Sequence, residues 1–229
     1  MRFTHRLGLA SVVATSCLVA SLAFPSTSFA HDPMYPKIGF HFRLALGGEE
    51  HGRSGSSGPF QSTPMEPGFG GGVELEVPLN PTFSLGAAFE AYGWTFRNAS
   101  DSYNVNFDFL FMPRVRIPFG DHPWHAEVYF GLPIGPSVSL PHDRFVAAIG
   151  TAPLEPGIGF TGGGRVGVRF NVNDILGFFA DVGPMFSYLT FPMRTGAPNF
   201  ELWHYQFVLR VGVSFGVGTP HRESEHHEH

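Results

Sequence analysis

Cysteine is nearly absent from this chain of 229 residues, and its one representative, Cys17, lies in the apolar N-terminal segment. A lone cysteine excludes a disulfide framework. Charge is scarce as well, because Asp, Glu, Lys and Arg make up 14% of the residues, against about 25% in an ordinary soluble domain. Lysine occurs once, as Lys37, and the formal net charge is −5. Without clustered cations to neutralise phosphates, the chain is not expected to bind nucleic acid.

Apolar residues and turn formers are abundant instead. The sequence contains 25 Phe, 29 Gly and 20 Pro, and aromatic residues reach 15%. This composition excludes a coiled coil, which needs charge and helix formers, and collagen, which needs a strict glycine period. The apolar content also argues against intrinsic disorder. After residue 30 no apolar run is long enough to cross a bilayer as a helix.

The first thirty residues have the organisation of a secretory signal. Arg2 and Arg6 precede an apolar stretch, Leu7–Phe24, and a small-residue cleavage pattern follows and ends at Ala30. We expect cleavage after Ala30, and the alternative is a single N-terminal membrane anchor. The mature chain then begins near residue 31 and contains no cysteine.

Eight segments of the mature chain alternate apolar and polar residues, which is the period of a strand with one apolar face. In the last of them, Trp203, Tyr205 and Phe207 alternate with His204 and Gln206. The segments cover residues 38–46, 73–77, 83–91, 105–117, 126–132, 166–170, 178–182 and 203–215. A tilted strand of roughly ten residues crosses a bilayer, so these segments suit a membrane barrel.

The connections between the segments alternate in length. Four are long and cover residues 47–70, 97–104, 135–157 and 189–199, and three are tight and cover residues 78–82, 118–123 and 171–174. This order is typical of an outer-membrane barrel with both termini in the periplasm. The sequence therefore predicts an all-β fold, an eight-stranded antiparallel up-and-down transmembrane β-barrel. Ten strands are the alternative, with the extra strands formed by residues 141–157.

The polar faces of the segments carry equal numbers of opposite charges. The twelve residues are Arg43, Glu74, Glu76, Glu90, Asp108, Arg114, Arg116, Glu127, Arg165, Arg169, Asp181 and Arg210. Six guanidinium groups and six carboxylates suit a narrow shared interior, because an unpaired buried charge is costly. The opposite faces carry bulky apolar residues, as lipid contact requires. We therefore prefer a barrel with an interior polar network to a soluble sandwich, whose polar face would meet water.

Aromatic residues gather near the ends of the segments, where lipid headgroups favour them. Those beside the long connections are Tyr92, Trp94, Tyr103, Tyr188 and Trp203, and those beside a short one are Phe119 and Trp124. Trp94 does not fit two outer aromatic bands, because strict alternation points it inward. A bulge near Gly93, or a position beyond the bilayer, would resolve the conflict.

The last segment ends in the motif Arg210-Val-Gly-Val-Ser-Phe-Gly-Val217. Arg210, Gly212, Phe215 and Val217 occupy the four specified positions of the C-terminal insertion signal that the barrel assembly machinery reads. Through this motif and its strand pattern, the chain resembles the small outer-membrane β-barrel proteins of Gram-negative bacteria, which include the OmpA transmembrane domain, OmpX and the opacity-type proteins. The resemblance implies localisation in the outer membrane, contact with its lipid and with the assembly machinery, and a monomer.

The expected domains are a cleaved signal peptide over residues 1–30, the barrel over 31–218 and a His- and Glu-rich periplasmic tail over 219–229. The tail departs from many relatives, which end at the aromatic residue of the motif. It is too short for a peptidoglycan-binding domain. Imidazole and carboxylate groups are suitable metal ligands, but a tail without structure offers little preorganisation, so no metal site is predicted.

No catalytic constellation is recognisable. The candidates are His41, His125 and His204 on the polar faces, and His142, Asp143, Ser137 and Ser139 in the third long connection. A GxSxG elbow is missing, and no His-x-Ser pair adjoins a strand end. An interior of paired charges readily accommodates imidazoles. Gly70–Gly72 and Gly162–Gly164 are not phosphate loops, because no Lys or helix-forming segment follows, and they suit bends or close packing in a barrel wall.

These patterns predict no enzyme and no cofactor. The preferred function is a structural or surface-interaction role, exerted through extracellular loops that contact a ligand outside the cell. The first alternative is a narrow, porin-like passive channel for ions or small solutes. A third is a lipid A-modifying barrel enzyme. An interior of eight strands is just wide enough for side chains to fill, which disfavours a wide channel.

Overall fold

A computed structural model describes residues 35–54, 59–95, 103–119, 125–143, 146, 154–173, 175–193 and 199–217. The expected signal peptide, Trp124 and the tail over 219–229 lie outside the described residues. No helix in the described ranges is long and apolar enough to span a membrane.

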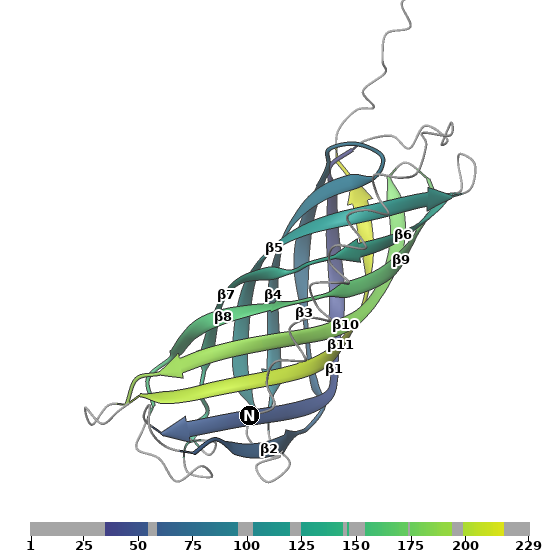
Figure 1. The fold of residues 1–229 in the computed structure, drawn as a ribbon. Helices are drawn as coiled ribbons and strands as arrows, with labels where there is room; N and C mark the ends of the chain where they lie inside the picture. The colour runs from purple at the N-terminus through teal and green to yellow at the C-terminus, as the bar shows by residue number, and fades with distance from the viewer. Residues whose placement is uncertain are drawn as a thin grey trace, which may run out of the picture.

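Eleven strand segments form one closed antiparallel sheet (Figure 1). They are β1 (Lys37–Ser54), β2 (Gln61–Met65), β3 (Gly68–Pro78), β4 (Phe83–Trp94), β5 (Asn104–Phe119), β6 (His125–Gly131), β7 (Ile134–Leu140), β8 (Gly157–Gly163), β9 (Arg165–Asn171), β10 (Leu176–Phe191) and β11 (Phe200–Gly216). β11 pairs with both β1 and β10, so the sheet closes on itself.

The wall of this barrel contains eight strands, as the sequence predicts. β6 and β7 both pair with β5 and are the two halves of one wall strand. β8 and β9 both pair with β10 and are the halves of the next. β2 pairs with the end of β1, outside the ring of eight. The ten-stranded alternative is therefore wrong.

Both divided strands break at the same height. β6 and β7 meet at Leu132 and Pro133, and β8 and β9 meet at Gly164. Pro113 on β5 and Pro184 on β10 lie beside these breaks, and their carbonyls accept hydrogen bonds from Leu132 and Gly164. Proline has no N–H to donate to the ladder, so the wall loses regular pairing along this line.

The predicted long connections are shorter than expected. Residues 134–140 and 157–163 of the third connection are wall strands, β1 continues to Ser54, and β10 continues to Phe191. Above the lipid an outer face need not be apolar, so the end of β1, from Glu49 to Ser54, lacks the alternation that marks a membrane strand. The barrel wall therefore extends beyond the aromatic band at the end that carries the long connections. We call this end of the barrel the loop end, and it lies at the lower left of Figure 1.

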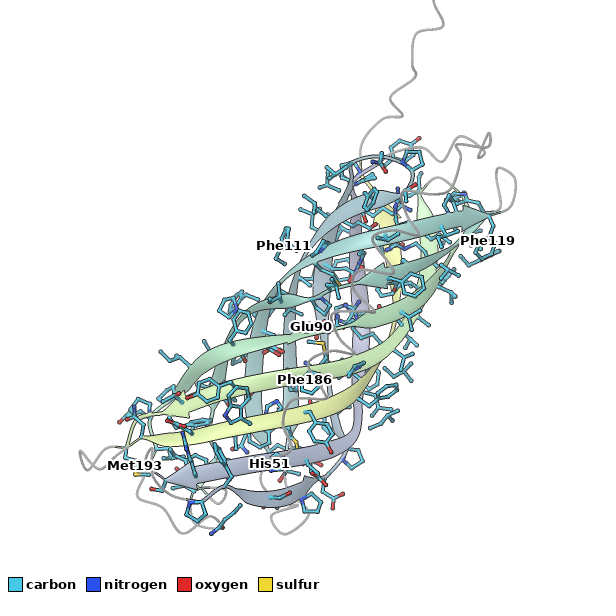
Figure 2. All side chains as sticks on the ribbon, in the orientation of Figure 1. His51, Glu90, Phe111, Phe119, Phe186 and Met193 are labelled. Carbon is cyan, nitrogen blue, oxygen red and sulfur yellow. The ribbon has the colours of Figure 1, made fainter. Side chains whose placement is uncertain are left out.

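The outer surface of the barrel is apolar over a broad band. Phe111, Phe119 and Phe186 project from it in Figure 2 and are each at least half exposed. The rings of Trp203 and Tyr188 contact each other at a tilt of 43° at the loop end, with ring centroids 4.5 Å apart, as expected of an interface band. The side chains of the opposite parity fill the lumen, which is the core of this molecule.

Candidate functional site

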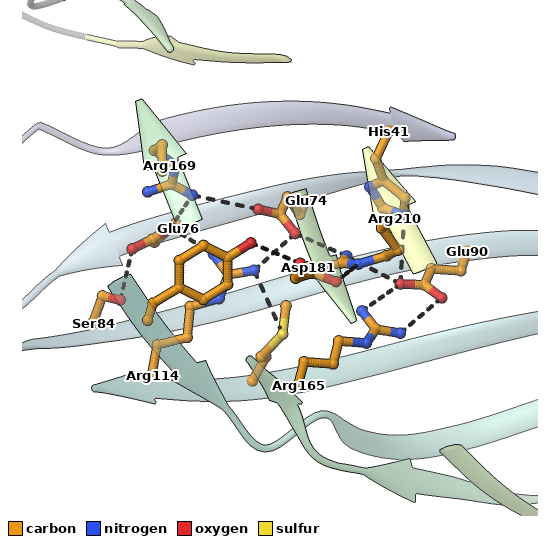
Figure 3. A network of polar contacts seen from close by, with 12 residues as sticks. His41, Glu74, Glu76, Ser84, Glu90, Arg114, Arg165, Arg169, Asp181 and Arg210 are labelled. Carbon is orange, nitrogen blue, oxygen red and sulfur yellow. Dashed lines mark hydrogen bonds and ion pairs between the residues drawn. The ribbon is translucent and has the colours of Figure 1, made fainter. Parts of the chain in front are cut away.

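A belt of charged side chains crosses the lumen between the two ends of the barrel. It consists of the twelve predicted residues Arg43, Glu74, Glu76, Glu90, Asp108, Arg114, Arg116, Glu127, Arg165, Arg169, Asp181 and Arg210, and each is no more than 3% exposed. The structure brings all twelve together, and we call them the charged belt. Figure 3 shows the part of the belt that surrounds Arg210 and Arg169.

One half of the charged belt is built around Glu76. Arg169 donates to Glu76 Oε2 at 2.7 Å and to Glu127 Oε1 at 2.6 Å. Arg114 donates to both Glu76 and Glu74, and Ser84 donates to the remaining Glu76 oxygen. Each carboxylate here therefore meets more than one donor, as buried charges need.

The other half is centred on Arg210. Its Nε donates to Asp181 at 2.9 Å, and its Nη1 lies 3.0 Å from Glu74 and 3.2 Å from Glu90. Arg165 donates two hydrogen bonds to Glu90 in a bidentate arrangement, at 2.8 and 3.1 Å. Because Glu74 also binds Arg114, the two halves form one continuous network (Figure 3).

Arg43 extends the charged belt towards the loop end. Its guanidinium lies 3.3 Å from Glu90 and 3.4 Å from Asp108. It also stacks on the Tyr92 ring, with 3.3 Å between the guanidinium carbon and the ring centroid. Ser137 donates to the second oxygen of Asp108 at 2.6 Å. Ser137 thus belongs to a wall strand and to this network, which corrects its predicted place in a loop.

Glycines on the inner face make room for these long side chains. A Cβ on Gly167 would stand 2.5 Å from the Tyr129 ring and 2.6 Å from Asp181 Cβ. A Cβ on Gly212 would stand 2.7 Å from the Phe179 ring. Real Cβ atoms do not make contacts this short, so glycine is required at these two positions, where the lumen side chains reach the wall.

The lumen beyond the belt, towards the loop end, holds an apolar cluster among buried polar side chains such as Asn106, Ser187 and His204. Its buried cluster, the loop-end cluster, consists of Met65, Tyr92, Trp94, Val146, Leu154, Leu189, Phe191, Met193, Phe200 and Leu202. Tyr92 points inward, so its predicted place in an outer aromatic band is wrong, while Trp94 points inward as strict alternation indicates. The pairing of Gly93 with Val105 is regular, so β4 has no bulge there. The indole N–H of Trp94 donates a hydrogen bond to Asn106 Oδ1 at 2.8 Å, within the barrel lumen.

Several lumen residues were absent from the predicted network. Lys37, Tyr129 and Gln206 share the parity of their charged neighbours, so alternation alone would have found them. Glu50 could not be found this way. β1 shifts register between Ala45 and Gly48, which reverses the parity and turns Glu50 inward in place of Glu49.

The candidate catalytic side chains divide between the charged belt, which holds His41 and Ser137, and the lumen on its loop side, which holds His204 and Ser139. His41 lies 3.4 Å from Glu90, within the charged belt. His142 uses its backbone N–H to bind the Asn104 side chain, while Ser137 is engaged by Asp108. No group of three or more His, Cys, Asp or Glu residues with metal-binding geometry occurs in the described ranges.

Fold and lumen together define the class of protein. An eight-stranded up-and-down barrel with an apolar outer band and a polar, filled interior has the architecture of a small outer-membrane β-barrel.

Solved structures of other outer-membrane barrels share this fold, among them the following two. OprG from Pseudomonas aeruginosa, an outer membrane protein, superposes with a TM-score of 0.57 at 11% identity, over 83% of this chain and 99% of that chain. The outer membrane protein AlkL gives a TM-score of 0.51 at 11% identity, over 87% of this chain and 98% of that chain. At this identity the likeness extends to the fold alone.

The other comparisons add no functional assignment. No family model matches the sequence, and no curated protein matches it. The outer membrane protease OmpT from Escherichia coli superposes with a TM-score of 0.33 at 9% identity, which is too low to bear on activity.

Proposed function

We propose that this protein is an outer-membrane barrel whose lumen is closed to solutes and whose role is structural or in surface interactions at its loop end. The apolar outer band supports a lipid environment, and the sequence of the first thirty residues supports export. On this proposal the loops are extracellular, the termini are periplasmic, and the protein works as a monomer without catalysis. Insertion would depend on the C-terminal motif formed by Arg210, Gly212, Phe215 and Val217.

The observation that carries the closed lumen is an ion pair across its full width. Glu76 on β3 and Arg169 on β9 belong to strands four places apart in the ring of eight, so their side chains meet from opposite walls. The contacts from Arg210 to Glu90 and from Arg43 to Asp108 join strands three places apart. An open channel would have to break such pairs, and each broken pair would leave a buried charge.

The extended wall supports a role at the loop end. β1, β10 and β11 continue past the band marked by Trp203, and the loop-end cluster lies between them. An apolar core of this kind holds the rim rigid, and a rigid rim presents its loops to a partner with little loss of entropy on binding.

Site-directed labelling in a Gram-negative host tests the location and the orientation. The mature chain lacks cysteine, so Ser57→Cys, between β1 and β2, and Ser224→Cys, in the tail, each introduce a single thiol. We expect a membrane-impermeant maleimide to label position 57 in intact cells, and position 224 only after the outer membrane is permeabilised. Labelling of position 224 in intact cells, or of neither position, would contradict the proposed topology.

A further inference from the structure

Glu50 is a buried carboxyl group that stands apart from the charged belt. Its two neighbours, Glu49 and His51, point outward with side chains 50% and 39% exposed, and they pair with Tyr205 and Trp203, so this part of β1 lies level with the aromatic band. The register shift at Gly47 and Gly48 turns Glu50 inward, where it is 3% exposed.

Four buried polar groups around this position have no hydrogen-bond partner among the described residues. They are Glu50 Oε2, both ring nitrogens of His204, Asn104 Nδ2 and Ser139 Oγ. Unsatisfied buried polar groups are rare and call for a partner that is not part of the chain. The four residues come from four different wall strands, β1, β11, β5 and β7.

Register and contacts place these residues around Trp94. Glu50 pairs directly with His204 across β1 and β11, and the His204 ring lies 5.3 Å from the Trp94 ring. Trp94 pairs directly with Asn104, and Ser139 pairs with Asn106, which accepts the indole hydrogen bond. The polar groups therefore border the loop-end cluster at the level of one indole ring.

An unpaired buried carboxyl group beside an aromatic ring suits a ligand that carries an amine. In the charged belt every carboxylate meets a guanidinium or a hydroxyl, whereas Glu50 has no cation beside it in the described part of the chain. Arg43, the belt cation nearest the loop end, is held by Tyr92, Glu90 and Asp108. An ammonium group would neutralise Glu50, and an aromatic ring such as Trp94 favours a cation or an apolar group beside it.

We propose that the loop-end lumen binds a small organic amine, with its ammonium group on Glu50 and its apolar body against Trp94 and the loop-end cluster. His204, Asn104 and Ser139 supply the remaining hydrogen bonds to the ligand or to a water beside it. The site lies on the loop side of the charged belt, so it does not depend on whether the lumen conducts.

Tryptophan fluorescence tests this site directly. The Trp124→Phe/Trp203→Phe double variant of the full mature chain leaves Trp94 as the only reporter. Refolded in phosphatidylcholine vesicles, it is titrated with 2-phenylethylamine and with the neutral 2-phenylethanol. We expect a saturable change in Trp94 emission with the amine, and binding of the alcohol that is weaker by about tenfold or more, because the alcohol lacks the charge-assisted contact.

Glu50→Gln and Glu49→Gln form a matched pair in the same background. Glu50→Gln is expected to weaken amine binding by about tenfold or more and to leave alcohol binding unchanged, while Glu49→Gln, on the outer face, changes neither. Equal effects of the two substitutions would overturn the proposal, as would equal affinities for amine and alcohol. The absence of any amine-dependent change in Trp94 emission would overturn it as well. The comparison of amine with alcohol needs no lumen variant, so it decides the question even if Glu50→Gln fails to fold.

Discussion

Arg210→Met removes the cation at the centre of the charged belt while keeping most of the side-chain length. In the folded protein Arg210 makes two contacts with Asp181 and one each with Glu74 and Glu90. Glu74 keeps Arg114, and Glu90 keeps Arg165. Asp181 loses both of its hydrogen bonds from a guanidinium and keeps the one from the Tyr129 hydroxyl at 2.7 Å, so it is the carboxylate most affected by the substitution.

The expected loss follows from leaving this buried carboxylate without a cation that donates a hydrogen bond to it. Removal of one partner of a buried ion pair typically costs about 3–5 kcal/mol. The double variant Arg210→Met/Asp181→Asn removes the orphaned charge as well, so it should recover most of that loss, since replacing both partners is far less costly than replacing one.

Urea unfolding in lipid vesicles, followed by tryptophan fluorescence, measures both free energies. Refolding in vitro also avoids the assembly machinery, whose proposed signal includes Arg210. An unchanged unfolding midpoint for Arg210→Met would mean that water screens the belt. A double variant as unstable as the single one would refute the pairing with Asp181.

Two further predictions use the same unfolding assay. Phe207→Arg places a cation on the outer face, where Phe207 is 49% exposed, and should cost about 2–4 kcal/mol at midplane depth; a neutral result would mean that this face does not meet lipid. Gly167→Val should destabilise by about 1–3 kcal/mol through its clash with the Tyr129 ring, whereas Gly164→Ala, whose Cβ meets nothing within 4 Å, should be tolerated; equal effects would show that the belt can move.

The barrel was predictable because lipid imposes a simple rule on its outer face. Phe207 and its neighbours on β11 alternate with polar residues over the whole membrane crossing, and this period survives in a single sequence. The equal numbers of Arg and acidic residues could be recognised in the sequence for a similar reason, because each charge buried in the lumen needs a partner of opposite sign.

Other features depend on register, which alternation does not reveal. The shift at Gly47 and Gly48 changes which side chains of β1 face inward, and Glu50 became visible only with it. The pairing of Arg169 with Glu76 depends on the stagger of strands on opposite walls. Ile134–Leu140 does alternate, but Gly135 and Pro136 are typical of a loop, and only the pairing with β5 and β8 identifies this segment as part of the wall.

Ion conductance of the refolded mature protein in planar bilayers tests the central claim most directly. Because Glu76 and Arg169 meet across the lumen, we expect insertion without steady conductance. Steady, reproducible conductance by the unmodified protein would contradict the closed lumen and establish the narrow channel in its place.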